Sequence, residues 1–179
     1  MIQVRLADLD ELWRITPMKE QIHALHVAGR PDLFAPFEDR SAFEAYVRED
    51  GLRLFLAERE GEPRGYALTR VVDRAANPYM RRRLFLRVEE ICVDERFRRQ
   101  GVGRALIQAV REEAQALGCP RVVLDVWSFN EEAMRFYQSM GFHAYQTFME
   151  CNTDECSWTL AEMGHGNPIH RPMRPGLLP

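Results

Sequence analysis

The stretch RRQGVGRALI, residues 98–107, decides the fold. Two glycines, Gly101 and Gly103, stand between a cluster of arginines and the beginning of an amphipathic helical pattern. Glycine lets a backbone approach a ligand closely, and arginine binds phosphate. A loop that ends on a helix N-terminus points free backbone N–H groups and the positive end of the helix dipole at one place. The sequence therefore predicts a phosphate-binding helix N-terminus over residues 98–104.

The segments around this stretch predict a strand, a helix and a second strand. Residues 84–93 (LFLRVEEICV) have the composition of a strand, and apolar residues recur at helical spacing from Val102 to Leu117. Gly118, with Pro120 two residues further on, gives the expected stop signal. Residues 122–127 (VVLDVW) are almost all apolar, as in a strand covered on both faces. A strand, a helix and a second strand in this order predict two parallel strands joined by a right-handed crossover.

The remaining elements follow from periodicity and turn signals. The other expected strands lie at 2–7, 52–60, 64–73 and near 144–150. The other expected helices lie over 8–29, over 42–48, and from Ser128-x-x-Glu131 to a stop at Gly141. Pro17 should split or kink the first of these helices, and Ser41 should cap the second. Gly61-Glu62-Pro63 should turn a β-hairpin.

The composition bounds the class of protein. Apolar residues make up 46% and charged residues 28% of 179 residues, the balance of a soluble globular domain. The net charge of −3 gives no reason to expect nucleic acid as a partner, and the arginine run 81–83 fits a solvated surface. No apolar stretch approaches the roughly 20 residues of a membrane span, and residues 1–13 lack a signal-peptide core. The cysteines show no disulfide spacing, so we expect a cytoplasmic protein away from membranes.

Other ligand classes fit the same residues less well. A Walker loop requires a lysine after its second glycine, and the one lysine of the chain is Lys19. A dinucleotide fingerprint requires a third glycine where Leu106 stands, although Asp125 lies about 20 residues on, where an acidic ribose partner would be. Two sets of residues have a spacing that resembles that of metal ligands. Cys151 and Cys156 with His165 and His170 lack a helix pattern for the histidines, and His23 with His26 lacks a third ligand. We therefore expect no metal.

Three motifs in order identify a family resemblance. A [RQ]-x-x-G-x-[GA] signature matches residues 98–103, and a V-x-x-x-[FY]-R approach matches residues 93–98. An FY-x-x-x-GF pattern matches residues 136–142, and Asn130 precedes it. On these motifs the chain resembles the GNAT superfamily of acyl-CoA-dependent N-acetyltransferases, most strongly over residues 84–150.

The resemblance implies a fold, a domain and ligands. The GNAT fold is α/β (α+β), with a mixed, mostly antiparallel sheet of about six or seven strands and helices on both faces. A central parallel pair of strands is splayed to bind CoA. We expect an N-acetyltransferase domain over residues 1–160 and a Pro/Gly-rich tail over 161–179. The implied ligands are acetyl-CoA as co-substrate and a small-molecule or peptide amine as acceptor.

The same resemblance assigns roles to matched residues. The backbones of Ile91, Cys92 and Val93 would pair with the pantetheine arm like an added strand. The diphosphate would be held, mostly by main-chain N–H groups, at Arg98, Arg99, Gln100, Gly101, Val102, Gly103 and Arg104. Asn130 would hydrogen-bond the arm or the thioester end, or else serve as a helix cap. Tyr137 would lie near the CoA sulfur and donate a hydrogen bond to the departing thiolate, or else be a core tyrosine.

The family reaction implies a direct attack of the amine on the thioester, without an acyl-enzyme. Only about one alkylamine in a thousand is unprotonated at neutral pH, so a proton acceptor is of value. Alternation on a strand sends Glu89 and Glu90 to opposite faces. The proton acceptor proposed for spermidine/spermine and arylalkylamine acetyltransferases aligns with Glu89. We therefore expect Glu89 as the base, directly or through water, and Glu90 as the second candidate. The alternative role for one of these glutamates is an ion pair with Arg87 or with the 81–83 run.

The identity of the acceptor stays open. Specificity is expected from residues 8–50, from the 74–83 turn and from the C-terminal strands, where the resemblance is weakest. Four acidic side chains would favour a cationic acceptor if they faced it: Glu89, Glu90, Asp94 and Asp125. A non-catalytic acyl-CoA-binding module and a pure interaction protein stay open as other functions. The use of other acyl groups, the formation of a homodimer and the role of the tail also stay open.

Overall fold

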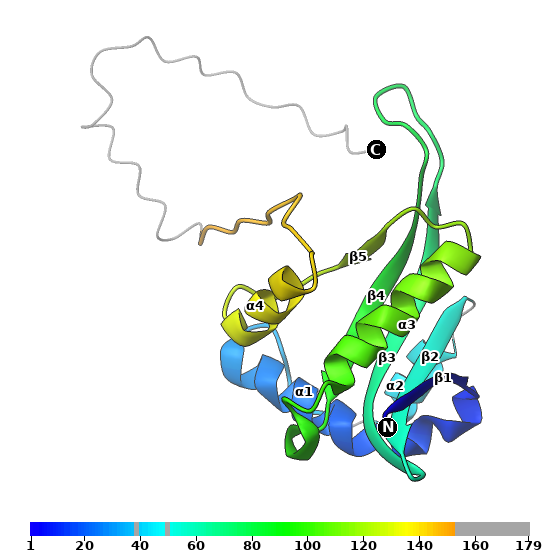
Figure 1. The fold of residues 1–179 in the computed structure, drawn as a ribbon. Helices are drawn as coiled ribbons and strands as arrows, with labels where there is room; N and C mark the ends of the chain where they lie inside the picture. Colours follow the sequence, from blue (N-terminus) through cyan, green and yellow to red (C-terminus); the bar gives the residue numbers. More distant parts are fainter. Residues whose placement is uncertain (38–39, 49–50, 153–179) are drawn as a thin grey trace. The chain divides into compact units, whose positions relative to one another are not determined.

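The computed structural model describes residues 1–37, 40–48 and 51–152, and its regular elements lie within residues 1–143 (Figure 1). The described strands form one sheet in the order β1-β2-β3-β4-β5. Their bounds are β1 Gln3–Ala7, β2 Leu52–Arg59, β3 Glu62–Arg74, β4 Arg83–Val93 and β5 Val122–Leu124. The first four strands pair antiparallel, and β4 pairs parallel with β5, as the strand–helix–strand pattern predicts.

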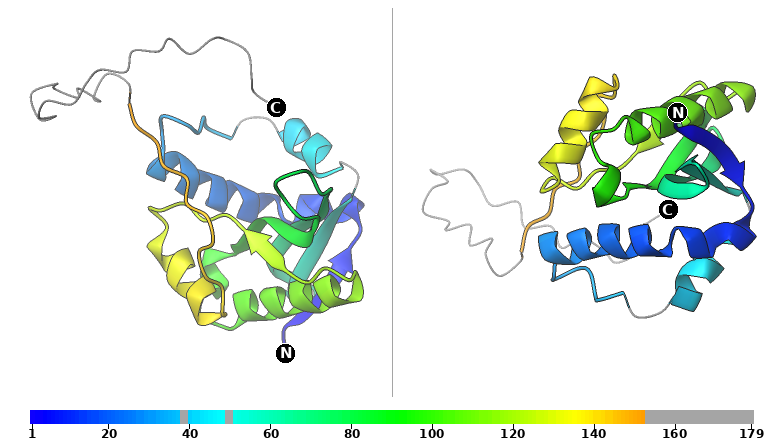
Figure 2. Two further views of the ribbon diagram at one scale, coloured as in Figure 1. Left: turned by 90° about the horizontal axis from the view of Figure 1, so that it is seen from above. Right: turned by 60° about the horizontal axis from the view of Figure 1, so that its bottom comes forward.

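Helices cover both faces of the sheet (Figure 2). Their bounds are α1 Thr16–Gly29, α2 Arg40–Val47, α3 Val102–Ala116 and α4 Glu131–Ser139, with 3-10 helices η1 Leu9–Arg14 and η2 Glu95–Phe97. Leu106 and Val110 of α3 pack on one face of the sheet, in a core with Leu86 and Val88. The segment from η1 to α2 packs on the other face, in a second core that includes Cys92. No helix in the described part of the chain is long and apolar enough to cross a membrane.

Local signals predict most of these boundaries. The predicted hairpin is present, but it turns on Glu60 and Gly61, which both have positive φ, and Glu62 and Pro63 of the expected turn already belong to β3. Pro17 lies in the first turn of α1, where its missing N–H removes no helical hydrogen bond. Gly118 and Gly141 adopt left-handed conformations just beyond α3 and α4. The helix expected from Ser128 instead begins at Glu131, and α2 begins at Arg40 rather than at a Ser41 cap.

The sheet differs from the expected one in its strand count. The sequence predicts a last strand over residues 144–150, but these residues carry no helix or strand. Alternation of apolar side chains does not make a strand by itself, because a strand requires a paired neighbour. The described residues therefore give five strands rather than six or seven, and the parallel pair lies at an edge of the sheet rather than at its centre. The expected tail, 161–179, lies outside the described residues.

A β-bulge in β4 breaks the alternation of its side chains. Leu68 of β3 pairs with Glu90, and the next residue, Thr69, pairs with Val88, so Glu89 is an extra residue without a partner on β3. Val88 packs in the core covered by α3, and Ile91 packs against that same core. The inward-facing positions therefore shift by one residue across the bulge. This shift decides where the two candidate bases point.

Candidate functional site

One side of β4 loses its partner strand just where the bulge begins. The parallel pairing with β5 covers only Leu86 to Val88, and it ends at the pair Val88–Leu124. Beyond it, β3 still pairs with Ile91 to Val93, but no described strand pairs with their other side. The expected parting of the two strands is therefore present, and it leaves an open strand edge over the residues whose backbones are expected to bind an extended ligand.

The N-terminus of α3 follows this open edge after η2 and a short loop. Gly101 precedes the helix with φ of +83°, and Arg99 has φ of +62°. No side chain caps the helix, and the first helical hydrogen bond runs from Ala105 N–H to Gly101 O at 3.0 Å. The N–H groups of Val102, Gly103 and Arg104 therefore have no helical acceptor. Unpaired N–H groups at a helix N-terminus favour an anion, and the phosphate site itself stays a prediction.

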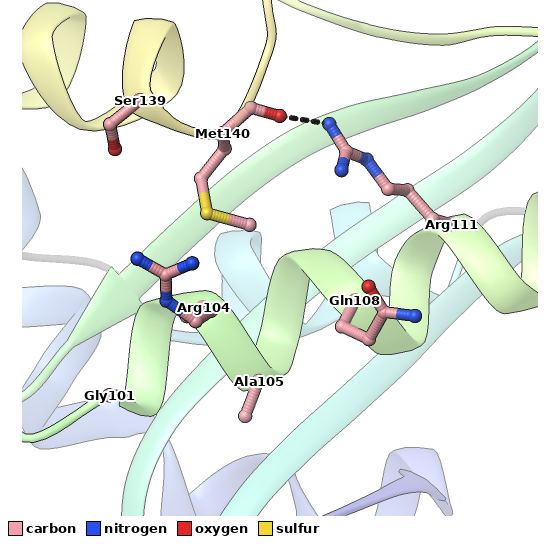
Figure 3. Close-up of a pocket in the computed structure, with 7 residues that line it drawn as sticks. All are labelled: Gly101, Arg104, Ala105, Gln108, Arg111, Ser139 and Met140. Carbon is pink, nitrogen blue, oxygen red and sulfur yellow. Dashed lines mark hydrogen bonds between the residues drawn. The ribbon is translucent and has the colours of Figure 1, made fainter.

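A pocket continues from this helix end along the outer side of α3 (Figure 3). Its volume is about 500 Å³, and its lining comes from α3 and the end of α4: Gly101, Arg104, Ala105, Gln108, Arg111, Ser139 and Met140. The Arg111 guanidinium donates to the carbonyl of Met140 and so ties the two helices together. Arg104 and Gln108 project from α3 and offer hydrogen-bond donors to a ligand. Of these lining residues, the sequence analysis predicts only Gly101 and Arg104 as ligand-binding. The others are missed because the sequence of α3 does not show that α4 packs beside it.

The two candidate bases lie on the same face, and the expectation of opposite faces is wrong. The Oε1 and Oε2 atoms of Glu89 accept from Arg70 Nε at 2.8 Å and from Arg87 Nε at 3.2 Å. Arg87 alternates with Leu86 and Val88, so it points away from the α3 core. Glu90 points the same way, because Lys19 Nζ of α1 lies 2.5 Å from its Oε2. The bulge, which sequence alternation ignores, brings both carboxylates to this face.

The two carboxylates have different surroundings. Glu89 has a side chain 10% exposed and forms the predicted ion pair with Arg87, which also pairs with Asp125. Glu90 accepts a further hydrogen bond, from the hydroxyl of the fully buried Tyr66. Each carboxylate is thus fully engaged by groups of its own chain.

Tyr137, which is half-buried, and Cys92, which is buried, both have raised pKa values. Burial raises the pKa of Tyr137 to about 12, with a smaller contribution from Cys92 nearby. Burial, followed by the charge of Glu90, raises the pKa of Cys92 to about 12. The Cys92 thiol donates to the carbonyl of Met18 at 3.3 Å. Tyr137 is therefore a neutral phenol over the physiological range, and Cys92 is a thiol rather than a nucleophilic thiolate.

The side chains of Asn130, His23 and His26 make contacts within the protein that support its fold. The Asn130 side chain caps α4 by accepting from Ala133 N–H at 3.1 Å, so its amide group keeps its donors for another partner. His26 stacks on Phe34 with ring centroids 5.0 Å apart, and His23 meets the same ring edge-on. Among the described residues no three His, Cys, Asp or Glu side chains form a group that could hold a metal ion. Cys156, His165 and His170 lie outside those residues.

Comparisons with known proteins agree on one family. The model of the acetyltransferase (GNAT) family matches residues 15–142. N-acetyltransferase 8 of Homo sapiens is 34% identical over 99 residues, which cover 55% of this chain and 42% of that protein. [Ribosomal protein bS18]-alanine N-acetyltransferase of Escherichia coli (strain K12) is 28% identical over 122 residues, 67% of this chain and 72% of that protein. The chain thus spans about two fifths of the first relative.

Solved structures share the fold. A tetramutant of the BH1408 protein from Bacillus halodurans superposes with a TM-score of 0.78 at 29% identity, covering 84% of this chain and 99% of that one. AAC(6')-Iy in complex with a bisubstrate analog gives a TM-score of 0.66 at 21% identity, covering 85% and 97%. At that identity the second likeness is evidence for the fold alone.

Proposed function

The chain belongs to the acetyltransferase (GNAT) family, and from this premise we propose that it transfers the acetyl group of acetyl-CoA to a primary amine by direct attack. The observation that carries the proposal is the junction of two features at the end of β4. An edge over Ile91 to Val93 that pairs with no described strand is followed, after η2 and a short loop, by a helix N-terminus whose first N–H groups have no helical acceptor. An extended amide-bearing arm that ends in a diphosphate matches this order of donors and acceptors.

Each part of acetyl-CoA has a matching part of the site. The two amides of pantetheine pair with the backbone of Ile91 and Val93 as an added strand would. The diphosphate lies on the N–H groups of Val102 to Arg104, where hydrogen bonds and the helix dipole both favour negative charge. The nucleotide end occupies the pocket between α3 and α4, where Arg104 offers a cation. The thioester then lies beyond the last β4–β5 pair, near Glu89.

The reaction needs a proton acceptor for the amine and a donor for the sulfur. Glu89 is our first candidate for the acceptor, through a water molecule because both of its oxygens already face guanidinium groups. Glu90 is the second candidate, held by Lys19 and Tyr66. Tyr137 donates a hydrogen bond to the departing sulfur, since a phenol with a pKa of about 12 stays protonated. A backbone N–H near Val93 stabilises the oxyanion.

A second function is favoured by one observation. Both candidate bases are engaged by cations of the chain, which also fits a non-catalytic acyl-CoA-binding module. Two measurements on the full chain separate the functions: calorimetric titration with acetyl-CoA, and release of free CoA in the presence of a panel of primary amines. Binding with turnover supports the acetyltransferase. Binding without turnover on any amine supports the module, and absence of binding contradicts both.

A further inference from the structure

Five aromatic rings from distant parts of the chain form one cluster beside the open edge of β4. His23 and His26 come from α1, Phe34 from the segment after α1, and Trp127 and Phe129 from the segment after β5. Phe34 contacts Trp127 edge-to-face with centroids 5.4 Å apart, and Trp127 stacks on Phe129 at 6.1 Å. We call this set the ring cluster. It joins the two chain segments that flank the gap between β4 and β5.

Packing fixes the ring cluster in place. The ring of Phe129 lies against the backbone of Gly29 so closely that a Cβ on this glycine would be 2.4 Å from it. The C-terminal end of α1 is thereby held near the start of α4, which the two views of Figure 2 place on the same side of the molecule. The stacking of His26 on Phe34 connects the cluster back to α1.

The ring cluster is continuous with the proposed reaction centre. Lys19 of α1 pairs with Glu90, and His23 and His26 follow it on the same helix four and seven residues on, so the three side chains project from one side of α1. Glu90 follows the bulge, where β4 pairs with β3 on one side and with no described strand on the other. An acceptor whose amine reached the thioester from the α1 side would lie near His26 and the rings beyond it.

The outer surface of the ring cluster is apolar and open. Trp127 is 38% exposed, and Val126 and Leu33, the chain neighbours of Trp127 and Phe34, are 37% and 53% exposed. Grouped apolar side chains at the surface of a protein commonly mark a binding site. Aromatic walls favour flat or apolar partners, because rings pack by offset stacking and edge contacts.

The charges near the site disfavour a polycationic acceptor. Glu89 pairs with Arg70 and Arg87, and Arg87 also pairs with Asp125. Glu90 pairs with Lys19, and the fourth acidic residue near the site, Asp94, pairs with Arg96. A substrate with several ammonium groups would have to displace these cations of the chain. The sequence-based reason to favour a cationic acceptor therefore loses its support.

Together these observations identify an acceptor class: we infer that the ring cluster binds the body of the acceptor, and that the acceptor is a primary amine carried on an aromatic group. The inference rests on the proposed acetyl transfer and adds the substrate class to it. Trp127 and Phe34 are the specificity-determining residues, because Phe34 contacts both His26 and Trp127, and Trp127 is 38% exposed.

The test is a comparison of amines that differ in their bodies. CoA release is measured with 2-phenylethylamine, tryptamine, ethylamine, spermidine and kanamycin at saturating acetyl-CoA, and the dissociation constant of acetyl-CoA is measured by calorimetry. We expect kcat/KM for the two aryl amines to exceed that for ethylamine at least about tenfold, since a ring buries much more apolar surface than a methyl group. Spermidine and kanamycin should be poorer than the aryl amines.

Variants localise the effect. Trp127→Leu and Phe34→Leu should each bring the ratio of kcat/KM for 2-phenylethylamine to that for ethylamine towards one, without weakening acetyl-CoA. Leucine is smaller but apolar, and both positions are partly exposed, so a folded variant is expected, and its melting temperature checks this. Trp13→Leu is the matched control, because Trp13 is an exposed tryptophan on η1, 71% exposed, and should leave the ratio as it is.

The outcomes separate the inference from the proposed function. Acetylation of ethylamine, spermidine or kanamycin at least as well as the aryl amines overturns the acceptor class and leaves acetyl transfer standing. An aryl preference that both leucine variants retain overturns the role assigned to the ring cluster, because the cluster is then not the cause of the preference. Acetyl-CoA binding without turnover of any amine in the panel overturns the inference, and failure to bind acetyl-CoA contradicts the proposed function itself.

Discussion

The two glycines at the ends of α3 allow a controlled test of the diphosphate site. Gly101 has φ of +83° and Gly118 has φ of +67°, and at both positions an added Cβ would meet nothing within 4 Å. Alanine at either position incurs the same kind of backbone strain, roughly 1–2 kcal/mol for a left-handed conformation. Only Gly101 lies at the helix end that we assign to the diphosphate. Gly101→Ala is therefore the perturbation, and Gly118→Ala is its matched control.

The two variants should separate stability from binding. Each should lower the melting temperature by several degrees, about 2–4 °C for each kcal/mol in a domain of this size. Gly101→Ala either places a methyl group where the diphosphate approaches or relaxes the backbone and turns N–H groups away. Loss of one hydrogen bond to a charged group is worth about 1.5–3 kcal/mol, so the affinity for acetyl-CoA should fall about 10- to 100-fold.

Calorimetric titration with acetyl-CoA, together with thermal unfolding, measures both quantities. We expect Gly118→Ala to bind acetyl-CoA like the unmodified chain while it unfolds at a lower temperature. The reasoning is refuted if Gly101→Ala binds as tightly as the unmodified chain. It is also refuted if Gly118→Ala weakens binding by the same factor, because the loss then follows from helix stability rather than from the site.

Further predictions concern the reacting groups and the buried thiol. Tyr137→Phe should lower kcat about tenfold without weakening acetyl-CoA, since it removes one hydrogen bond to the departing sulfur; an unchanged kcat argues against that role. Glu89→Gln should lower kcat/KM by about two orders of magnitude without weakening acetyl-CoA, and an unchanged kcat/KM excludes Glu89 as the base. Burial raises the pKa of Cys92 from 9.0 to about 12, so between these pH values the folded chain keeps a proton that the unfolded chain releases. The free energy of unfolding is therefore unaffected below pH 9 and falls as the pH rises towards 12. Denaturant titrations at pH 8 and pH 10 should show a fall of about 1 kcal/mol that Cys92→Ala removes, and an equal fall in both proteins would contradict the assignment.

The features that the sequence predicts correctly are those decided within one element or one turn. The start of α3 at Gly101 and its stop at Gly118 need only the chemistry of glycine at helix ends. The hairpin at Gly61 needs only a turn residue between two apolar runs. The parallel pair follows from the order strand, helix, strand, because the crossover has a fixed hand. Local patterns of residues are therefore enough to predict the glycine loop before α3 and the parallel strands beside it.

The features that the sequence does not predict depend on pairing between distant segments. The bulge at Glu89 exists because β3 pairs with Glu90 and Val88 on either side of it, and no local pattern in β4 marks it. The ion pair of Glu89 with Arg70 joins residues on different strands. The ring cluster brings together three segments, and only the packed fold shows that they meet. The expected strand at 144–150 is wrong for the same reason, since pairing rather than composition makes a strand.

A crystal structure of the full chain with CoA tests the central claim most directly. We predict diphosphate oxygens within about 2.7–3.2 Å of the backbone nitrogens of Val102 to Arg104, the usual distance of an N–H to oxygen hydrogen bond. We also predict the pantetheine arm along the unpaired edge of β4, with its amides on the backbone of Ile91 and Val93. CoA bound elsewhere on the molecule, or a diphosphate held away from the N-terminus of α3, would contradict the account.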